Sequence, residues 1–216
     1  NQYLSLNQNI KIHYLKMKIL KFKGFYQMYK KALLLNQNGD EFLGWTTELF
    51  QPATGELIFN TAMTGFVEIL SDPSYINQIV TFTSSHVGNY GMSQRDFESN
   101  MPKIEAAIGN SFTDFPSSWR SEKSIPSWLK EYDIPYSGGF DVRNITKYLR
   151  DNGSSMFALG VDIDIKDLIE ILYKAKDILG DNSAMTAGNQ DDRDTSTDGK
   201  IGIMDLGAKK KHCKST

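Results

Sequence analysis

The chain has 216 residues and a mass of 24.4 kDa, with 40% hydrophobic and 23% charged residues and a formal net charge of -2. This composition excludes a collagen, a low-complexity disordered chain and a disulfide-stapled miniprotein. The single cysteine, Cys213, has no partner for an internal disulfide, and no pattern typical of a secretory signal is present. No apolar run approaches the roughly 20 residues that cross a bilayer. We therefore expect a soluble, cytoplasmic protein that has no membrane partner.

Charge is distributed unevenly along the chain. Residues 1–39 contain seven lysines and no acidic residue, whereas acidic residues outnumber basic ones in the rest. An acidic globular part argues against nucleic acid as the main partner. The basic opening is either an amphipathic segment on a membrane surface or sequence that precedes a natural start at Met28. We favour the second interpretation and expect residues 1–27 to be extraneous.

The first half of the chain has the pattern of β-strands. Residues 32–35 form an apolar run closed by Asn38-Gly39, a dipeptide typical of tight hairpin turns, and residues 42–49 are expected to form the returning strand. Residues 57–59 and 78–82 are further strand candidates, because β-branched and aromatic residues suit a pleated sheet.

The second half has the pattern of helices. Ser124 can cap a short helix that stops before Pro135. Asp141 can cap a longer helix that ends at Gly153, and a third helix is expected over residues 164–179. Strands followed by helices indicate an α/β or α+β layer fold.

A dense motif in residues 55–91 places polar side chains and turn residues between strands, which is how loops present hydrogen-bonding groups on a sheet. The motif residues are Gly55-Glu56, Phe59-Asn60-Thr61, Met63-Thr64-Gly65-Phe66, Glu68, Leu70-Ser71-Asp72-Pro73-Ser74-Tyr75, Gln78-Ile79-Val80 and Gly88-Asn89-Tyr90-Gly91. This motif closely resembles the amino-terminal domain of the small, glutamine-hydrolysing chain of carbamoyl-phosphate synthase, and further matches continue to about residue 160 and resume over 204–209. The chain departs from the family at Ser84-Ser85, where Tyr-Pro is usual, and at Ser71 and Val142, where Thr is usual.

The resemblance implies a domain organisation. We expect a layered β/β/α swivelling domain, of α/β class, over residues 28–180. A polar linker follows over residues 181–199. Residues 200–216 would then be the first strand of a truncated class I glutamine amidotransferase domain.

The resemblance also implies a function. The family's small chain hydrolyses glutamine through a cysteine activated by a histidine, and ammonia passes to a large chain that binds ATP and Mg and makes carbamoyl phosphate for pyrimidine and arginine synthesis. The present residues stop before that cysteine, so we assign them no catalytic residue, cofactor or metal, and we expect them to be inactive alone. The alternative is a non-catalytic interaction module that binds a synthetase-like large chain. Coding sequence beyond Thr216 would distinguish the two.

Ser74 is the one substrate-binding residue that the resemblance carries over. The serine of the family's Asp-Pro-Ser-Tyr motif helps to hold glutamine, and a hydroxyl that donates and accepts suits an amino acid's charged ends. The plainer interpretation is that Ser74 is a turn residue after Pro73.

Three other features do not support a site. Cys213 lies beside His212 among lysines, which would lower a thiol pKa, but no glycine-flanked turn surrounds it and we expect an ordinary helix cysteine. Residues 194–205 fit the outline of a calcium loop but lack good flanking helices. The three histidines show no zinc-ligand spacing.

Overall fold

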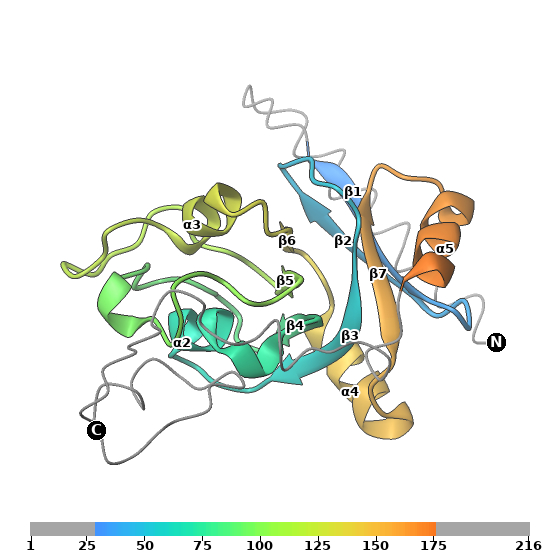
Figure 1. Ribbon diagram of the computed structural model, residues 1–216, viewed down its shortest axis with the longest axis horizontal. Helices are drawn as coiled ribbons and strands as arrows, with labels where there is room; N and C mark the ends of the chain where they lie inside the picture. Colours follow the sequence, from blue (N-terminus) through green and yellow to red (C-terminus); the bar gives the residue numbers. More distant parts are fainter. Residues whose placement is uncertain (1–28, 176–216) are drawn as a thin grey trace, which may run out of the picture.

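A computed structural model describes residues 29–175, which form a mixed α/β domain built on one seven-stranded sheet (Figure 1). The α/β class is therefore confirmed. No helix within this part of the chain is long and apolar enough to cross a membrane. The strands are β1 (Lys30–Asn36), β2 (Glu41–Thr46), β3 (Ala53–Asn60), β4 (Gln78–Phe82), β5 (Ala106–Ile108), β6 (Tyr136–Ser137) and β7 (Met156–Val161).

The described residues also form four α-helices and two short 3-10 helices. The two longest α-helices follow β6 and β7, whereas the shorter elements lie between β3 and β6. They are α2 (Phe66–Ser71), η1 (Pro73–Tyr75), η2 (Gln94–Asp96), α3 (Ile125–Glu131), α4 (Val142–Asn152) and α5 (Ile165–Lys174).

The sheet has an antiparallel part and a parallel part. The strand order is β2-β1-β7-β3-β4-β5-β6, and pairing is antiparallel from β2 to β3 but parallel from β3 to β6. Parallel strands need long crossover connections, whereas an antiparallel pair can be joined by a tight turn. The long connections all run from the parallel part, which is at the left in Figure 1.

The sheet curls until its two edge strands meet. The Trp45 amide in β2 donates to the Gly138 carbonyl just after β6 at 2.9 Å, and the Gly138 amide donates back to the Trp45 carbonyl at 3.2 Å. The Ser137 hydroxyl adds a third bond to the Trp45 carbonyl at 3.1 Å. The neighbouring Gly139 has φ 69°, and a Cβ there would fall within 2 Å of the Trp45 ring. This seam therefore requires glycine for both backbone and packing reasons.

Strand alternation divides the apolar residues between an inner and an outer face. In β1, Ala32 and Leu34 point into the curl while Leu33 and Leu35 point outward. Helix α4 closes the inner core with Ile145 and Leu149. The inner core also includes Ala53, Leu57, Ile79, Ala106, Ile108, Phe140, Phe157, Leu159 and Val161.

The outer face is covered differently at its two ends. Helix α5 covers β1 and β7 through Leu168 and Leu172, in a small cluster. Helices α2 and α3 cover β4 and β5 in a larger cluster that contains Trp128, and Trp128 stacks on Phe97 with ring centroids 4.8 Å apart. Figure 1 shows α5 at one end of the molecule and α2 with α3 at the other.

The predicted hairpin and helix boundaries are largely confirmed. Asn38-Gly39 turns β1 into β2, although β2 ends at Thr46 rather than at residue 49. The Ser124 and Asp141 side chains cap α3 and α4 by accepting the amides of residues 127 and 144, at 3.2 and 3.0 Å. Gly153 ends α4 with φ 80°. Helix α5 begins as predicted but ends at Lys174.

Among the described strands and α-helices, four were not predicted: α2, β5, β6 and β7. Helix α2 has six residues, and its cap, Gly65, supplies no side-chain hydrogen bond, so the usual start signal is absent. Strands β5 and β6 have three and two residues, which are too few to show the alternation of apolar and polar residues that predicts a strand. The predicted segments 1–27, 181–199 and 200–216 lie outside the described residues, as do residues 176–180.

Candidate functional site

The segments that follow the parallel strands β3, β4 and β5 meet at one hollow on the surface, which we call the exit pocket. Its volume is about 360 Å³. The segment after β3 leads into α2, the segment after β4 contains η2, and the segment after β5 leads towards α3. Open parallel sheets commonly bind ligands beyond the carboxyl ends of their strands. The exit pocket is lined by Thr64, Gly65, Glu68, Tyr90, Gly91, Ser93, Asp96, Ser118 and Arg120.

Main-chain hydrogen bonds fasten the walls of the exit pocket together. The Thr113 amide donates to the Val87 carbonyl at 2.9 Å, and the Ser117 amide donates to the Asn89 carbonyl at 2.9 Å. A few residues later, the Glu122 amide donates to the Met92 carbonyl at 2.8 Å. The Glu122 carboxylate also accepts from the Ser93 hydroxyl at 2.9 Å. The segment 113–122 is therefore held at both of its ends against the segment 87–93.

The lining residues have an unequal balance of charge. Arg120 pairs with Asp96 at 3.0 Å, and both side chains are partly exposed. Glu68 has no ion pair among the described residues, and its Oε2 is buried without a hydrogen-bond partner there. A carboxylate oxygen that lacks both water and a donor is unfavourable. With Glu68 and Asp96 against Arg120, the lining carries one more negative than positive charge and therefore favours a ligand that brings a positive charge.

Tyr90 experiences this negative field directly. Its hydroxyl accepts the Phe66 amide at 2.7 Å at the start of α2, and its ring stacks on Phe66 with centroids 5.7 Å apart. Burial raises the pKa of Tyr90, and the negative charges of Glu68 and Asp96 raise it further. Tyr90 therefore remains a neutral hydroxyl and can still donate one hydrogen bond.

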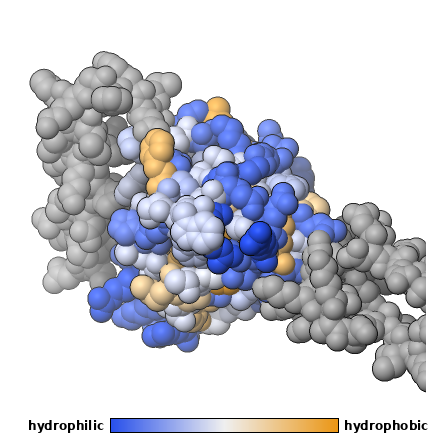
Figure 2. All heavy atoms as spheres, turned by 90° about the vertical axis from the view of Figure 1, so that its left-hand side faces the viewer, coloured by the Kyte–Doolittle hydropathy of each residue, from blue (hydrophilic) through white to orange (hydrophobic). Residues whose placement is uncertain are grey.

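The exit pocket is lined mainly by hydroxyl, carboxylate and guanidinium side chains. Its described lining contains no cysteine or histidine. Within residues 29–175, no group of three histidine, cysteine or carboxylate side chains is placed to hold a metal ion. Figure 2 views the molecule from the end at the left of Figure 1, and shows mostly hydrophilic atoms with separate hydrophobic patches between them.

Ser74 lies at the other end of α2, in the 3-10 helix η1, and does not line the exit pocket. Its amide donates to Asp72 Oδ1 at 2.9 Å, and Pro73 fixes the first position of the turn. The residue is exposed, so its hydroxyl is accessible from solvent. The next residue, Tyr75, is tied to the end of β3 because its hydroxyl accepts from Asn60 Nδ2 at 3.1 Å.

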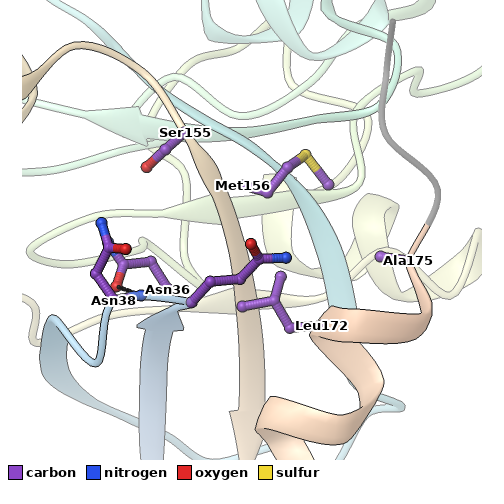
Figure 3. A pocket seen from close by; sticks show the side chains of 7 residues that line it. Asn36, Asn38, Ser155, Met156, Leu172 and Ala175 are labelled. Carbon is purple, nitrogen blue, oxygen red and sulfur yellow. Dashed lines mark hydrogen bonds between the residues drawn. The ribbon is translucent and has the colours of Figure 1, made fainter. Parts of the chain in front are cut away.

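A second hollow of about 250 Å³ lies between the end of β1, the start of β7 and the last turn of α5 (Figure 3). One of its lining residues, Asn36, already uses its side-chain polar atoms within the domain. Asn36 Nδ2 donates to Asp40 and to the Tyr148 hydroxyl, both at 2.9 Å, and its Oδ1 accepts the amides of Asn38 and Asp40. This network stabilises the hairpin turn, so the Asn36 side chain is not available to a ligand in the second hollow.

The structure leaves several predicted features unplaced, and it adds residues that sequence reasoning missed. Cys213 and the calcium-loop outline over residues 194–205 lie outside the described residues. None of Glu68, Tyr90, Asp96 and Arg120 was predicted to lie at a pocket. They belong to segments that match the family, but only the parallel pairing of β3, β4 and β5 brings those segments together. A prediction of parallel strands would have supplied that signal.

The fold defines an α/β domain whose polar loops surround a pocket beyond the parallel strands of a curled sheet. Residues 33–159 match the sequence model of the family described as carbamoyl-phosphate synthase small chain, CPSase domain. The chain belongs to the carbamoyl-phosphate synthase small-chain family, as its motifs predicted.

Curated relatives support the same assignment. The chain is 41% identical over 143 residues to the carbamoyl phosphate synthase small chain of Thermosynechococcus vestitus, covering 66% of this chain and 37% of that protein. It is equally similar to the pyrimidine-specific small chain of Halalkalibacterium halodurans, of which it covers 40%. The small chain of Thermotoga maritima is 38% identical over 154 residues, which cover 71% of this chain and 39% of that protein. The chain thus spans about two fifths of the length of these relatives.

Proposed function

We propose that this chain is part of the small subunit of a glutamine-dependent carbamoyl-phosphate synthase. The small subunit hydrolyses glutamine and supplies ammonia to a large subunit, which binds ATP and Mg and forms carbamoyl phosphate for pyrimidine and arginine synthesis in the cytoplasm. The observation that carries the proposal is the family match over residues 33–159. These 216 residues contribute binding and docking surfaces, and we propose that they hydrolyse no glutamine by themselves.

Ser74 is the proposed contact to glutamine. The Asp72 side chain and the Pro73 ring fix the turn that carries it, so the exposed hydroxyl is presented without a large loss of loop entropy on binding. A serine hydroxyl can donate to the carboxylate of an amino acid or accept from its ammonium group. Because Ser74 is not part of a nucleophile arrangement in the described residues, its role is to bind and orient the substrate.

The experiment is a Ser74→Ala substitution in the intact small subunit assembled with its large subunit. One hydrogen bond to a charged group contributes about 1.5–3 kcal/mol, so we expect the KM for glutamine to rise by about 10- to 100-fold. Synthesis from ammonium chloride, which needs no glutamine, should be unchanged. Initial rates of carbamoyl phosphate formation with each nitrogen donor measure both effects.

Ser85→Ala is the matched control, because Ser85 is also an exposed serine in a loop beside β4. It should leave both nitrogen donors unaffected. An unchanged glutamine KM in Ser74→Ala would contradict the binding role of Ser74. Failure of the wild-type assembly to use glutamine at all would contradict the proposed function.

A further inference from the structure

The described lining of the exit pocket carries more negative than positive charge. Arg120 compensates Asp96 across 3.0 Å, but no described cation compensates Glu68. Glu68 lies in the first turn of the short helix α2, whose first amide donates to the Tyr90 hydroxyl. Because water reaches only part of this carboxylate, an incoming cation would gain more here than at an open surface.

Large apolar side chains stand exposed on the two loops that line the exit pocket. Met63, Phe115 and Trp119, which we call the rim, are 71%, 91% and 91% exposed. Met63 precedes Thr64, Trp119 lies between the lining residues Ser118 and Arg120, and Phe115 precedes Pro116, which packs beside Gly91. Aromatic residues, Met and Arg are the side chains enriched at the centres of protein interfaces.

Two of the three rim residues, Phe115 and Trp119, are presented on one loop that is held in place. The hydrogen bonds of Thr113, Ser117 and Glu122 to the segment 87–93 hold the loop that carries Phe115 and Trp119 on both sides. Binding to a loop that is already held costs less conformational entropy than binding to a free one. Exposed aromatics on such a loop are therefore suited to contact another protein.

The chemistry of the exit pocket favours lysine over arginine. The guanidinium group of arginine binds both oxygens of a carboxylate, but Glu68 Oε2 is shielded inside the protein. An ammonium group is a compact charge with three donors, which can bind one carboxylate oxygen and nearby hydroxyls such as those of Ser93 and Ser118. The four-carbon stem of lysine can lie along an apolar surface such as the rim.

We propose that the exit pocket and its rim form the surface on which the large subunit docks, and that a lysine of the large subunit inserts its ammonium group beside Glu68. This inference rests on the proposed function, because it takes the large subunit as the partner. It adds the docking face, the anchoring charge and the residues of the small subunit that contact the partner.

The test measures the affinity of the intact small subunit for the purified large subunit by isothermal titration calorimetry. We expect Glu68→Gln, which keeps the shape and removes the charge, to raise the Kd by about tenfold or more. Trp119→Ser should raise it by a similar factor, as for other central aromatic residues. Raising the salt concentration should weaken the wild-type complex more than the Glu68→Gln complex.

Two control variants lie away from the exit pocket. Glu41→Gln removes an exposed carboxylate from β2, and Tyr173→Ser removes a tyrosine on α5 that is 64% exposed. Both should leave the Kd unchanged. Thermal unfolding of each variant shows whether it is folded. If Glu68→Gln is not folded, Trp119→Ser provides an independent test of the docking face.

The outcomes separate this inference from the proposed function. If wild-type and both exit-pocket variants bind the large subunit equally well, the docking face is wrong while the proposed function stands. If the wild-type small subunit does not bind the large subunit, the proposed partner is wrong and this inference falls with it. A third outcome is that Glu68→Gln leaves the Kd unchanged and alters only the amide hydrogen exchange of residues 209–214. The lysine-rich segment of the same chain would then occupy the pocket, and the inference would be overturned.

Discussion

The antiparallel and parallel parts of the sheet use the same inner core but differ in what they present outside. On the antiparallel side, β1 and β2 are joined by a tight turn, and the polar side chains of Asn36, Asp40 and Tyr148 bind one another. On the parallel side, the connections over residues 83–105 and 109–135 are long, and their polar side chains surround the exit pocket.

The difference follows from how strands are connected. A tight antiparallel turn must satisfy its own backbone, so its polar groups are used locally. A parallel connection has to cross the sheet, and its excess length places side chains where they are free to bind other molecules. The antiparallel part therefore acts as scaffold, and the parallel part carries the proposed binding functions.

The largest loss of stability should come from a substitution in the apolar cluster that covers the outer face of the parallel part. Trp128→Ala leaves a cavity where Trp128 stacks on Phe97, and we expect it to lower the free energy of unfolding by about 3–5 kcal/mol. Leu172→Ala, in the smaller cluster under α5, should cost less. Urea denaturation of both variants measures the difference. A larger loss for Leu172→Ala would show that the α5 end contributes more to stability.

The next largest loss of stability is expected at the seam, where the edge strands of the two parts meet. Gly139→Ala places a Cβ against the Trp45 ring at a residue with φ 69°, so strain and overpacking together should cost about 2–3 kcal/mol. Gly39→Ala is the matched control, because φ there is 84° but no atom lies within 4 Å of the added Cβ. It should cost about 1 kcal/mol, from backbone strain alone. Equal thermal shifts for the two variants would contradict the importance of the seam.

A smaller effect should appear at alkaline pH. Burial raises the pKa of Tyr136 in β6 to about 12, with further contributions from Glu48 and Asp114. Because the folded protein holds this proton more tightly than the unfolded chain, Tyr136 contributes its full stability below pH 10 and loses it between about pH 10 and 12.

A rise in the pKa from 10.0 to about 12 corresponds to about 2.7 kcal/mol, and solvent screening at this partly exposed residue reduces the expected loss to about 1 kcal/mol. Urea denaturation at a series of pH values measures the loss. Tyr136→Phe should remove this part of the pH dependence, whereas Tyr29→Phe, at an exposed position outside the sheet, should not. An identical alkaline profile for Tyr136→Phe would assign the loss to other groups.

Local signals in the sequence predicted the elements that short-range chemistry determines. Asn38-Gly39 identified the hairpin, Ser124 and Asp141 identified two helix starts, and Gly153 identified a helix end. Strand β7 was missed although it lies between β1 and β3 in the sheet, because its pairing partners are more than 90 residues away in the sequence. An unbroken apolar run fits a buried strand or a buried helix equally well.

The site was predictable to the same limited extent. Ser74 could be named as a candidate, and stays a prediction, because the Asp-Pro-Ser-Tyr motif is continuous in the sequence. The exit pocket could not, because Glu68, Tyr90 and Arg120 come from segments that only the parallel pairing of strands brings together. The most informative property of the exit pocket is the uncompensated charge of Glu68. That property exists because the fold brings no described cation to the Glu68 carboxylate and no described hydrogen-bond donor to its Oε2.

The seam between Trp45 and Gly138 also limits how other chains can bind this domain. An open sheet edge offers unpaired amides and carbonyls on which a strand from another molecule can extend the sheet. Here the two edges use those groups on each other, through reciprocal bonds of 2.9 and 3.2 Å. At this point the domain is closed to strand addition and to the edge-to-edge aggregation that accompanies it. A partner must instead recognise side chains, which makes recognition depend on the loops beyond the parallel strands.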